Sequence, residues 1–353
     1  MSQRQRSRRP GDRLGDWVID EVLTYTEPLL YAAHNANVVD KTVVLKVAPW
    51  DKATAALHRR ELFALRTLSH NTIPTRVDAG VEAEDGLRWC AFEPFRAESL
   101  ADQLLRGPLD HRTACRVLSR VADALTHLHE RDLQFRDLTP MNVFITDHES
   151  VVLFGMDHVM DPADAERSGD LGGSVSYMAP EVLADRQGHG TAAEVYAFGC
   201  LLYEALTARA PFPAATWGRQ SSRVQRALQW KTRARPLDPG DGTPDWLRDL
   251  IRKCTHPDPE RRITDAFVVR EWLESNRSDW QSEQEPTDSV PFVPVANLPP
   301  LRVQPEAFLA AIPTAGAGAP PISVLYVSAA AMGCVAGLAF SAVVMLAIDT
   351  AGG

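Results

Sequence analysis

The chain has 353 residues, of which 45% are hydrophobic and 24% are charged, as in a globular protein long enough for two lobes and an appended segment. Its formal net charge of −9 argues against general binding to nucleic acid. The five cysteines are scattered and lack C-x-x-C spacing, which predicts reduced thiols and neither a metal site nor a disulfide framework. They are Cys90, Cys115, Cys200, Cys254 and Cys334.

The chain opens with a basic arm, residues 1–11, in which no apolar stretch follows the arginines. This pattern predicts a disordered, solvated segment rather than a signal peptide, with attraction to anionic lipid as the alternative. From residue 12 the pattern becomes β-like. Residues 17–23 alternate as a strand, residues 29–33 form a second strand-like run, and residues 24–28 between them contain no glycine.

Two further stretches of the N-terminal region carry charged residues in apolar surroundings. Residues 42–47 form an apolar run that contains Lys46 next to its end. Residues 57–68 place apolar side chains at helical spacing, and Glu61 lies within them. A solvated surface glutamate remains the alternative for Glu61. Residues 89–95, W-C-A-F-E-P-F, indicate a buried strand that ends in a turn.

The middle of the chain contains the stretch with the most chemical content. A single apolar stripe predicts a helix over residues 111–129. The sequence L-Q-F-R-D-L-T-P-M-N follows at residues 133–142, with an acid at Asp137 and an amide at Asn142, and the β-like run 143–146 comes next. Residues 133–142 resemble the catalytic loop of the eukaryotic-type protein kinases, and the resemblance makes them a candidate catalytic loop.

Three later stretches complete the set: G-S-V-S-Y-M-A-P-E at 173–181, E-V-Y-A-F-G at 194–199 and H-P-D-P-E-R-R at 256–262. In this order, the motifs resemble those of the eukaryotic-type (Hanks-type) serine/threonine protein kinases of bacteria. The resemblance implies an α+β, bilobal fold with a small β-rich N-lobe over residues 12–95 and a larger α-helical C-lobe over residues 96–277. It also implies a nucleotide cleft between the lobes.

The resemblance assigns roles to individual residues. Asp137 matches the aspartate that accepts the proton of the substrate hydroxyl, and Asn142 matches the asparagine that holds Mg²⁺. Lys46 matches the lysine that pairs with the ATP phosphates, and Glu61 matches the glutamate that pairs with this lysine. The positions whose backbone would face the adenine are Glu93 and Phe95. The expected ligands are therefore ATP and Mg²⁺.

Two departures from the family weaken the expected phosphate site. The family carries a G-x-G-x-x-G loop between its first two strands, whereas residues 24–28 read T-Y-T-E-P. Without glycine the backbone approaches phosphates less closely, and the Glu27 carboxylate repels them. Thr139 stands where serine/threonine kinases place a lysine against the γ-phosphate, so one positive charge is missing.

The third departure concerns the aspartate of the D-F-G motif, which lies thirteen residues after the asparagine in the family. Counting from Asn142, this position is Gly155. A register with two residues deleted from the hairpin places Leu153 there instead. Asp157 is the nearest acid, and in a continuing strand it would lie about 7 Å further along. We therefore expect a metal site that is lost or remodelled around Asn142 and Asp157.

The C-terminal quarter changes in composition. Residues 278–321 are rich in Pro, Gly and Ala, which predicts a disordered tether. Residues 322–348 carry no charge and would form a helix about 40 Å long, enough for one transmembrane span, and the tail 349–353 follows. The acidic tail favours a cytoplasmic kinase-like domain anchored to the cell membrane. Small residues at every fourth position predict self-association into a homodimer, although Ala/Gly-rich spans also produce this spacing: Gly333, Gly337 and Ser341.

These features lead to one principal hypothesis and two alternatives. The principal one is a membrane-anchored pseudokinase with weak or absent phosphotransfer, which can accept ATP weakly and acts through protein partners. The first alternative is a divergent, active serine/threonine kinase in which Asn142 and Asp157 hold the metal and a protein is the substrate. The second is a structural membrane-assembly protein that never binds nucleotide.

Overall fold

The computed structural model describes residues 8–280, apart from 26–27, 39, 53, 147–149, 162–172, 186–189 and 213–219. The predicted transmembrane helix and its Gly333, Gly337 and Ser341 face lie outside the described residues, as does most of the predicted tether. Among the described residues, no helix is long and apolar enough to cross a membrane.

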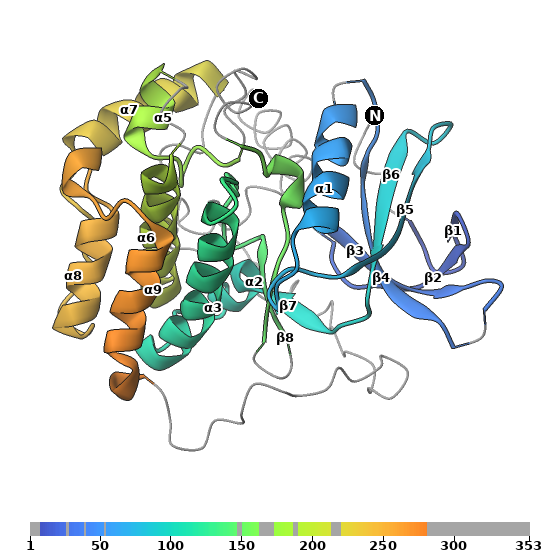
Figure 1. Ribbon diagram of the computed structural model, residues 1–353, viewed down its shortest axis with the longest axis horizontal. Coiled ribbons are helices and arrows are strands. Elements are labelled where there is room, and N and C mark those ends of the chain that lie inside the picture. The colour runs from blue at the N-terminus through green and yellow to red at the C-terminus, as the bar shows by residue number, and fades with distance from the viewer. Residues whose placement is uncertain are drawn as a thin grey trace, which may run out of the picture. The chain divides into compact units, whose positions relative to one another are not determined.

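An antiparallel sheet of six strands forms the N-lobe, in the order β1-β2-β3-β4-β6-β5 (Figure 1). The strands are β1 Arg13–Leu14, β2 Trp17–Val22, β3 Leu29–Asn35, β4 Thr42–Pro49, β5 Arg76–Glu82 and β6 Leu87–Phe92. Side chains alternate along β4, so that Val43, Leu45 and Val47 join one hydrophobic core. Val44 joins a second cluster, which leaves Lys46 on the same face as Val44.

Helix α1 (Ala55–Thr67) accompanies this sheet in the N-lobe, and its Leu62 and Leu65 pack against the second cluster. The predicted helical segment 57–68 is therefore confirmed to within two residues. The apolar spacing that predicted the helix also determines which side faces inward, because Glu61 and Ala64 are buried whereas Phe63 is exposed.

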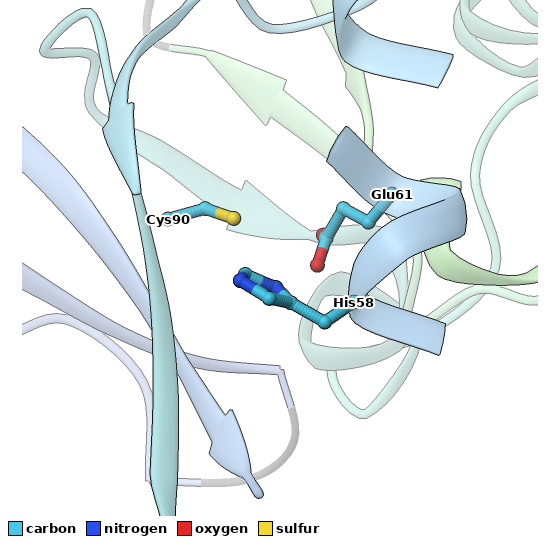
Figure 2. Close-up of side chains that lie close together, drawn as sticks. All are labelled: His58, Glu61 and Cys90. Atoms are coloured by element: carbon cyan, nitrogen blue, oxygen red, sulfur yellow. The ribbon is translucent and has the colours of Figure 1, made fainter. Parts of the chain in front are cut away.

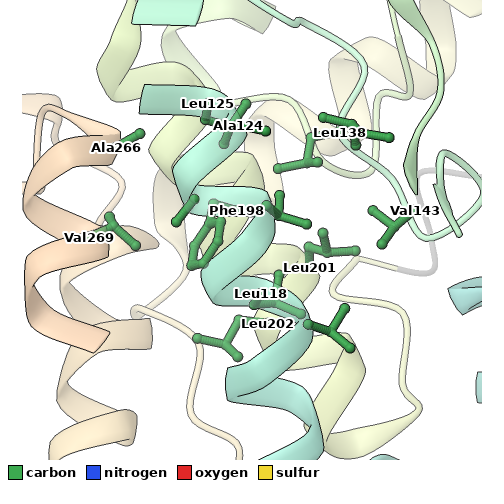
Figure 3. Close-up of a cluster of buried hydrophobic side chains, with 14 of the residues drawn as sticks. Leu118, Ala124, Leu125, Leu138, Val143, Phe198, Leu201, Leu202, Ala266 and Val269 are labelled. Atoms are coloured by element: carbon green, nitrogen blue, oxygen red, sulfur yellow. The ribbon is translucent and has the colours of Figure 1, made fainter. Parts of the chain in front are cut away.

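The C-lobe is predominantly helical, as predicted (Figure 1). Its α-helices are α2 Leu100–Leu104, α3 His111–His129, α5 Pro180–Asp185, α6 Thr191–Thr207, α7 Gln220–Arg233, α8 Asp245–Cys254 and α9 Ala266–Ser275. A small sheet, β7 Ala97–Ser99, β8 Val143–Thr146 and β9 Val151–Leu153, lies on the N-lobe side of α3. Figure 3 shows the main core, in which Leu118 and Leu125 of α3 lie with Phe198 and Leu201 of α6 and Val269 of α9.

Both ends of the folded body extend beyond the predicted boundaries. We expected a disordered arm up to residue 11, but the backbone N–H of Arg8 donates to the Tyr31 hydroxyl at 3.0 Å and that of Gly11 donates to the Ile19 carbonyl at 2.8 Å. We expected the tether to begin at residue 278, but Trp280 is 5% exposed and its indole N–H donates to the Leu273 carbonyl at 3.0 Å. Trp280 joins the core because its large apolar surface is best buried against α9.

An ion pair connects two distant segments of the C-lobe. The Arg262 guanidinium donates to both carboxylate oxygens of Glu181, at 2.6 and 3.0 Å, and the Arg262 side chain is fully buried. Glu181 lies in α5, directly after the segment that approaches the candidate catalytic loop. A bidentate pair of this kind fixes both orientation and distance, so it holds α5 in place.

Candidate functional site

Glu194 of α6 holds the candidate catalytic loop, residues 133–142, through a hydrogen bond. One carboxylate oxygen of Glu194 accepts the backbone N–H of Arg136 at 2.6 Å, and the other lies 2.7 Å from Nε2 of His129 at the end of α3. Arg136 has a φ of 68°, which a non-glycine residue adopts only when its surroundings enforce it. Burial alone would lower the pKa of His129, but the hydrogen bond and charge of Glu194 outweigh burial and raise it. The contact with His129 thus helps to position the Glu194 carboxylate that holds the loop.

The loop brings Asp137 and Asn142 together. The Asn142 side-chain amide donates to the Asp137 carbonyl at 2.8 Å and to the Asp137 carboxylate at 2.9 Å. The backbone N–H of Ser174 also donates to this carboxylate. Burial raises the pKa of Asp137, although His158 and these hydrogen bonds partly offset the effect. Asp137 is therefore placed and oriented as a hydrogen-bond acceptor at the cleft.

A cavity of about 40 Å³ lies beside Asp137, between the loop and the segment that precedes α5; Ser174, Tyr177 and Met178 are among its lining residues. Lys231 of α7 holds this segment by hydrogen bonds to its backbone. Its side-chain nitrogen donates to the carbonyls of Val175, Ser176 and Met178 at 3.0, 2.8 and 2.6 Å. Lys231 is only 1% exposed. Burial lowers the pKa of Lys231 to about 7.

Four charged side chains form a buried network at the N-lobe side of the cleft. The Lys46 ammonium lies 2.6 Å from the Glu61 carboxylate, which is the pairing that the sequence predicted, and 3.6 Å from Asp157. Arg88 of β6 donates to the second oxygen of Glu61 at 2.9 Å and to Asp157 at 2.8 Å. The guanidinium of Arg88 thus bridges the two carboxylates, and the four formal charges of the network cancel.

The network holds its members in their charged forms. Burial alone would lower the pKa of Lys46, but the carboxylates of Asp157 and Glu61 outweigh burial and raise it. Burial alone would raise the pKa of Asp157, but Lys46, His158 and Arg88 hold it well below its ordinary range. Lys46 and Arg88 each lie against both carboxylates of the network, an arrangement that favours the charged forms of Lys46, Arg88 and Asp157.

His58 and Cys90 lie beside this network, and their ligand atoms and that of Glu61 are within 4.8 Å of one another (Figure 2). The three residue types could bind a transition metal, but both Glu61 oxygens already accept hydrogen bonds from cations. Burial together with the charges of Arg88 and Lys46 lowers the pKa of His58 to about 4. Because both Glu61 oxygens are engaged by cations, we assign no metal to this cluster.

Gly155 occupies the place beside Asn142 where the family has its metal-binding carboxylate. Its φ is +98°, and a Cβ added there would lie 2.9 Å from the Asn142 amide nitrogen. The expected continuation of the strand toward Asp157 is wrong, because β9 ends at Leu153 and Met156–His158 form a 3-10 turn. This turn directs Asp157 to Arg88 and Lys46 rather than along a strand. The residues present therefore do not fit the family's Mg²⁺ site.

Thr24 makes local hydrogen bonds in the turn that takes the place of the glycine-rich loop. The Thr24 hydroxyl donates to the Pro28 carbonyl at 2.6 Å and accepts the backbone N–H of Leu30 at 2.8 Å. Glu27, which we expected to repel phosphates, lies outside the described residues. Among the described residues that follow positions 26–27, Pro28 has no N–H and the Leu30 N–H is bonded to Thr24, so neither of these two positions offers a free donor to a phosphate.

An aromatic cluster lies where the predicted base-facing residues are. The ring of Phe154 lies 5.4 Å from that of Phe92, 5.1 Å from that of Phe144 and 5.7 Å from that of Phe95. The backbone N–H of Glu93 donates to the Thr75 carbonyl at 3.0 Å, so this donor is already used. Sequence reasoning placed Glu93 and Phe95 near the cleft but did not anticipate the ring cluster.

Arg88 is the functional residue that the sequence analysis missed. It lies in the strand L-R-W-C-A-F, whose residues are all buried, and an arginine in such a run is a signal of a buried ion pair. Its partners cannot be read from the sequence, because Glu61 and Asp157 lie 27 and 69 residues away.

The comparisons with known proteins agree with this geometry. The protein kinase domain family matches residues 30–276. CDPK-related kinase 5 of Arabidopsis thaliana is 30% identical over 253 residues, which are 66% of this chain and 39% of that protein. Serine/threonine-protein kinase PrkC of Bacillus subtilis is 27% identical over 276 residues, which are 72% of this chain and 41% of that protein.

Human serine/threonine-protein kinase ULK3 is 30% identical over 171 residues, which are 47% of this chain and 34% of that protein. The matches thus span well under half the length of these relatives. Kinase domains in general use ATP and Mg²⁺, which makes the altered metal position of this chain a specific departure. Because the family match spans well over half of its residues, the chain belongs to the protein kinase domain family.

Proposed function

We propose that this chain is a membrane-anchored signalling protein that uses a protein kinase fold as a binding module, with weak or absent phosphotransfer, and acts through protein partners. One observation carries the proposal. Gly155 stands beside Asn142 where a metal-binding acid is needed, and the next acid along the chain, Asp157, is engaged by Lys46 and Arg88.

The size of the expected defect follows from what phosphoryl transfer requires. The reaction depends on positioning and electrostatic stabilisation rather than on covalent chemistry by the protein. Removal of one preorganised charge-stabilising group costs about 10²–10³-fold in rate in comparable enzymes. Here a metal ligand, the glycine-rich loop and the Thr139 position all depart from the family, so turnover falls from roughly 1–100 per second to minutes or longer per event.

Phosphotransfer is tested with the purified full chain in detergent, labelled ATP, and Mg²⁺ or Mn²⁺. We expect no incorporation into the chain or into a generic protein substrate above that of an Asp137→Ala variant. Asp137→Ala is a suitable reference because it removes the candidate base without touching the Lys46 network. Incorporation that the wild-type chain supports and Asp137→Ala abolishes would refute the proposal.

A divergent active kinase is the second candidate, and a specific observation favours it. The Lys46–Glu61 pair at 2.6 Å and the Asn142–Asp137 contact at 2.9 Å are arranged as catalysis would require. In that case Asp157 and Asn142 would hold the metal, and ATP would stabilise the protein in a Mg²⁺-dependent manner. Loss of this thermal stabilisation in Asp157→Ala is the result that would support the enzyme.

The membrane anchor is part of the proposal and rests on the uncharged stretch 322–348. A single span would leave the kinase-fold body on the cytoplasmic side, and packing through Gly333, Gly337 and Ser341 would make a homodimer. The full chain should stay in the membrane fraction after alkaline carbonate extraction, whereas a chain ending at residue 321 should be released. Gly337→Ile should abolish crosslinked dimers in detergent; crosslinking that is unaffected would contradict the proposed dimer face.

A further inference from the structure

The residues at the expected nucleotide site, between the sheet and the C-lobe, already have partners within the chain. At the phosphate end of a kinase cleft the lysine normally has one protein carboxylate and remains available to phosphates. Here Lys46 lies near two carboxylates, Glu61 at 2.6 Å and Asp157 at 3.6 Å, and is 6% exposed. Its positive charge is therefore balanced before any ligand arrives.

Arg88 supplies the second cation that balances the two carboxylates beside Lys46. Because it donates to both Glu61 and Asp157, it ties α1 to the turn after β9. Lys46, Arg88, Glu61 and Asp157 have no net charge together, so they exert little attraction on a polyanionic triphosphate. The side chains of Arg88 and Glu61 are only 4% and 3% exposed, so solvent screens these contacts weakly.

The base-facing end of the cleft is filled as well. Leu30 and Val44 of the sheet are 2% and 0% exposed, and they join one cluster with three phenylalanines that are each 1% exposed: Phe92, Phe144 and Phe154. The Phe154 ring is the centre of this cluster, because three other rings lie within 5.7 Å of it. Apolar surface that would otherwise contact a purine is thus covered by the chain itself.

We propose that the chain occupies its own nucleotide cleft, with Asp157 beside Lys46 in the place of phosphate groups and the Phe154 ring cluster at the base-facing end. The organised position of α1 is then maintained by Arg88 and Asp157 rather than by a nucleotide. This inference deepens the proposed function and rests on it in treating the cleft as a remnant nucleotide site. It makes Arg88 a positioning residue for Glu61.

The test measures nucleotide binding without measuring transfer. The full chain in detergent is titrated calorimetrically with ATP, once with Mg²⁺ and once with EDTA. Asp157→Asn keeps the shape of the side chain but leaves one net positive charge around Lys46. We expect this variant to bind ATP about tenfold more tightly than the wild-type chain, since one like charge is removed beside the phosphates. Adding Lys46→Met to Asp157→Asn should abolish the gain.

Asp241→Asn is the matched control, because Asp241 is 98% exposed and lies in the C-lobe. It makes the same change in charge and should leave ATP binding unchanged. Hydrogen exchange of the α1 amides provides the second readout, and in the wild-type chain these amides should be equally protected with and without ATP.

Each result decides the inference. A folded Asp157→Asn that binds ATP no better than wild type would overturn it, as would ATP-dependent protection of α1 in the wild-type chain. If Asp157→Asn does not fold, the wild-type titration decides: a dissociation constant near millimolar supports self-occupation, and one near micromolar overturns it. Tight binding without phosphotransfer would remove this inference and leave the proposed function standing.

Discussion

Replacement of Arg88 by methionine should destabilise the protein strongly, because it leaves two buried carboxylates with one cation. Arg88 contacts Glu61 at 2.9 Å and Asp157 at 2.8 Å. At an effective dielectric constant of about 20, each contact contributes about 6 kcal/mol before desolvation is subtracted. Breaking a buried pair from one side typically costs about 3–5 kcal/mol, because the remaining charge stays buried and unpaired. We expect a loss in this range for Arg88→Met.

The double variant Arg88→Met/Asp157→Asn separates charge balance from packing. It restores neutrality, since Lys46 and Glu61 remain as a simple pair, so its destabilisation should fall short of the sum of the single variants by about 1–3 kcal/mol. Unfolding of the full chain in urea, followed by tryptophan fluorescence, measures these differences because Trp89 is adjacent to Arg88. Arg13→Met, at an arginine whose side chain is 54% exposed, is the control and should change little.

Two outcomes would refute this reasoning. Arg88→Met could reduce the free energy of unfolding by less than about 1 kcal/mol, the range of an exposed pair. Alternatively, the effects of the two substitutions could add without interaction, which would mean that Arg88 and Asp157 do not share the network.

Three further predictions concern groups around the site. His58→Gln should make stability less sensitive to acid. In the folded state the pKa of His58 is lowered from 6.5 to about 4, so the unfolded wild-type chain binds a proton that the folded chain does not. The free energy of unfolding of the wild-type chain should therefore fall by up to about 3 kcal/mol as the pH decreases from 6.5 to 4, and denaturation at two pH values will measure this fall. Lys231→Met should leave three carbonyls without their donor and increase the rate of proteolysis at residues 175–178. Lys231→Arg keeps a side-chain donor and should be cleaved more slowly than Lys231→Met. Arg262→Met should lower the free energy of unfolding by about 3–5 kcal/mol, because Glu181 would lose its ion-pair partner. A melting temperature within experimental error of wild type would contradict this prediction.

Much of the fold could be predicted because local periodicity and long-range structure agree. The apolar run around Lys46, with its resemblance to a family strand, and the helical spacing around Glu61 predicted a strand and a helix close to their observed bounds. The pairing of these residues followed from the resemblance, since spacing alone cannot place a strand lysine against a helix glutamate. The folded ends at residues 8 and 280 were missed because short polar segments carry no periodic signal.

The geometry after β9 could not be predicted for a different reason. A strand was expected to continue toward Asp157, but the positive φ of Gly155 and the 3-10 turn that follows redirect the chain. Glycine permits several backbone conformations, so its presence identifies a place of freedom without specifying the outcome. Arg88 contacts this redirected Asp157, and therefore the pairing of the two residues could not be read from the sequence.

The network also weighs against the second candidate function. For Asp157 to bind a metal together with Asn142, its carboxylate would have to leave Arg88, whose side chain is 4% exposed. The guanidinium would then keep only Glu61, which it shares with Lys46, and the N-lobe would hold two buried cations against one anion. Leaving this charge imbalance buried costs several kcal/mol. Metal binding would have to offset this cost, although Gly155 contributes no ligand beside Asn142. A metal-dependent kinase reaction therefore requires Asp157 to leave Arg88 and Lys46, which would break the link between α1 and the turn after β9.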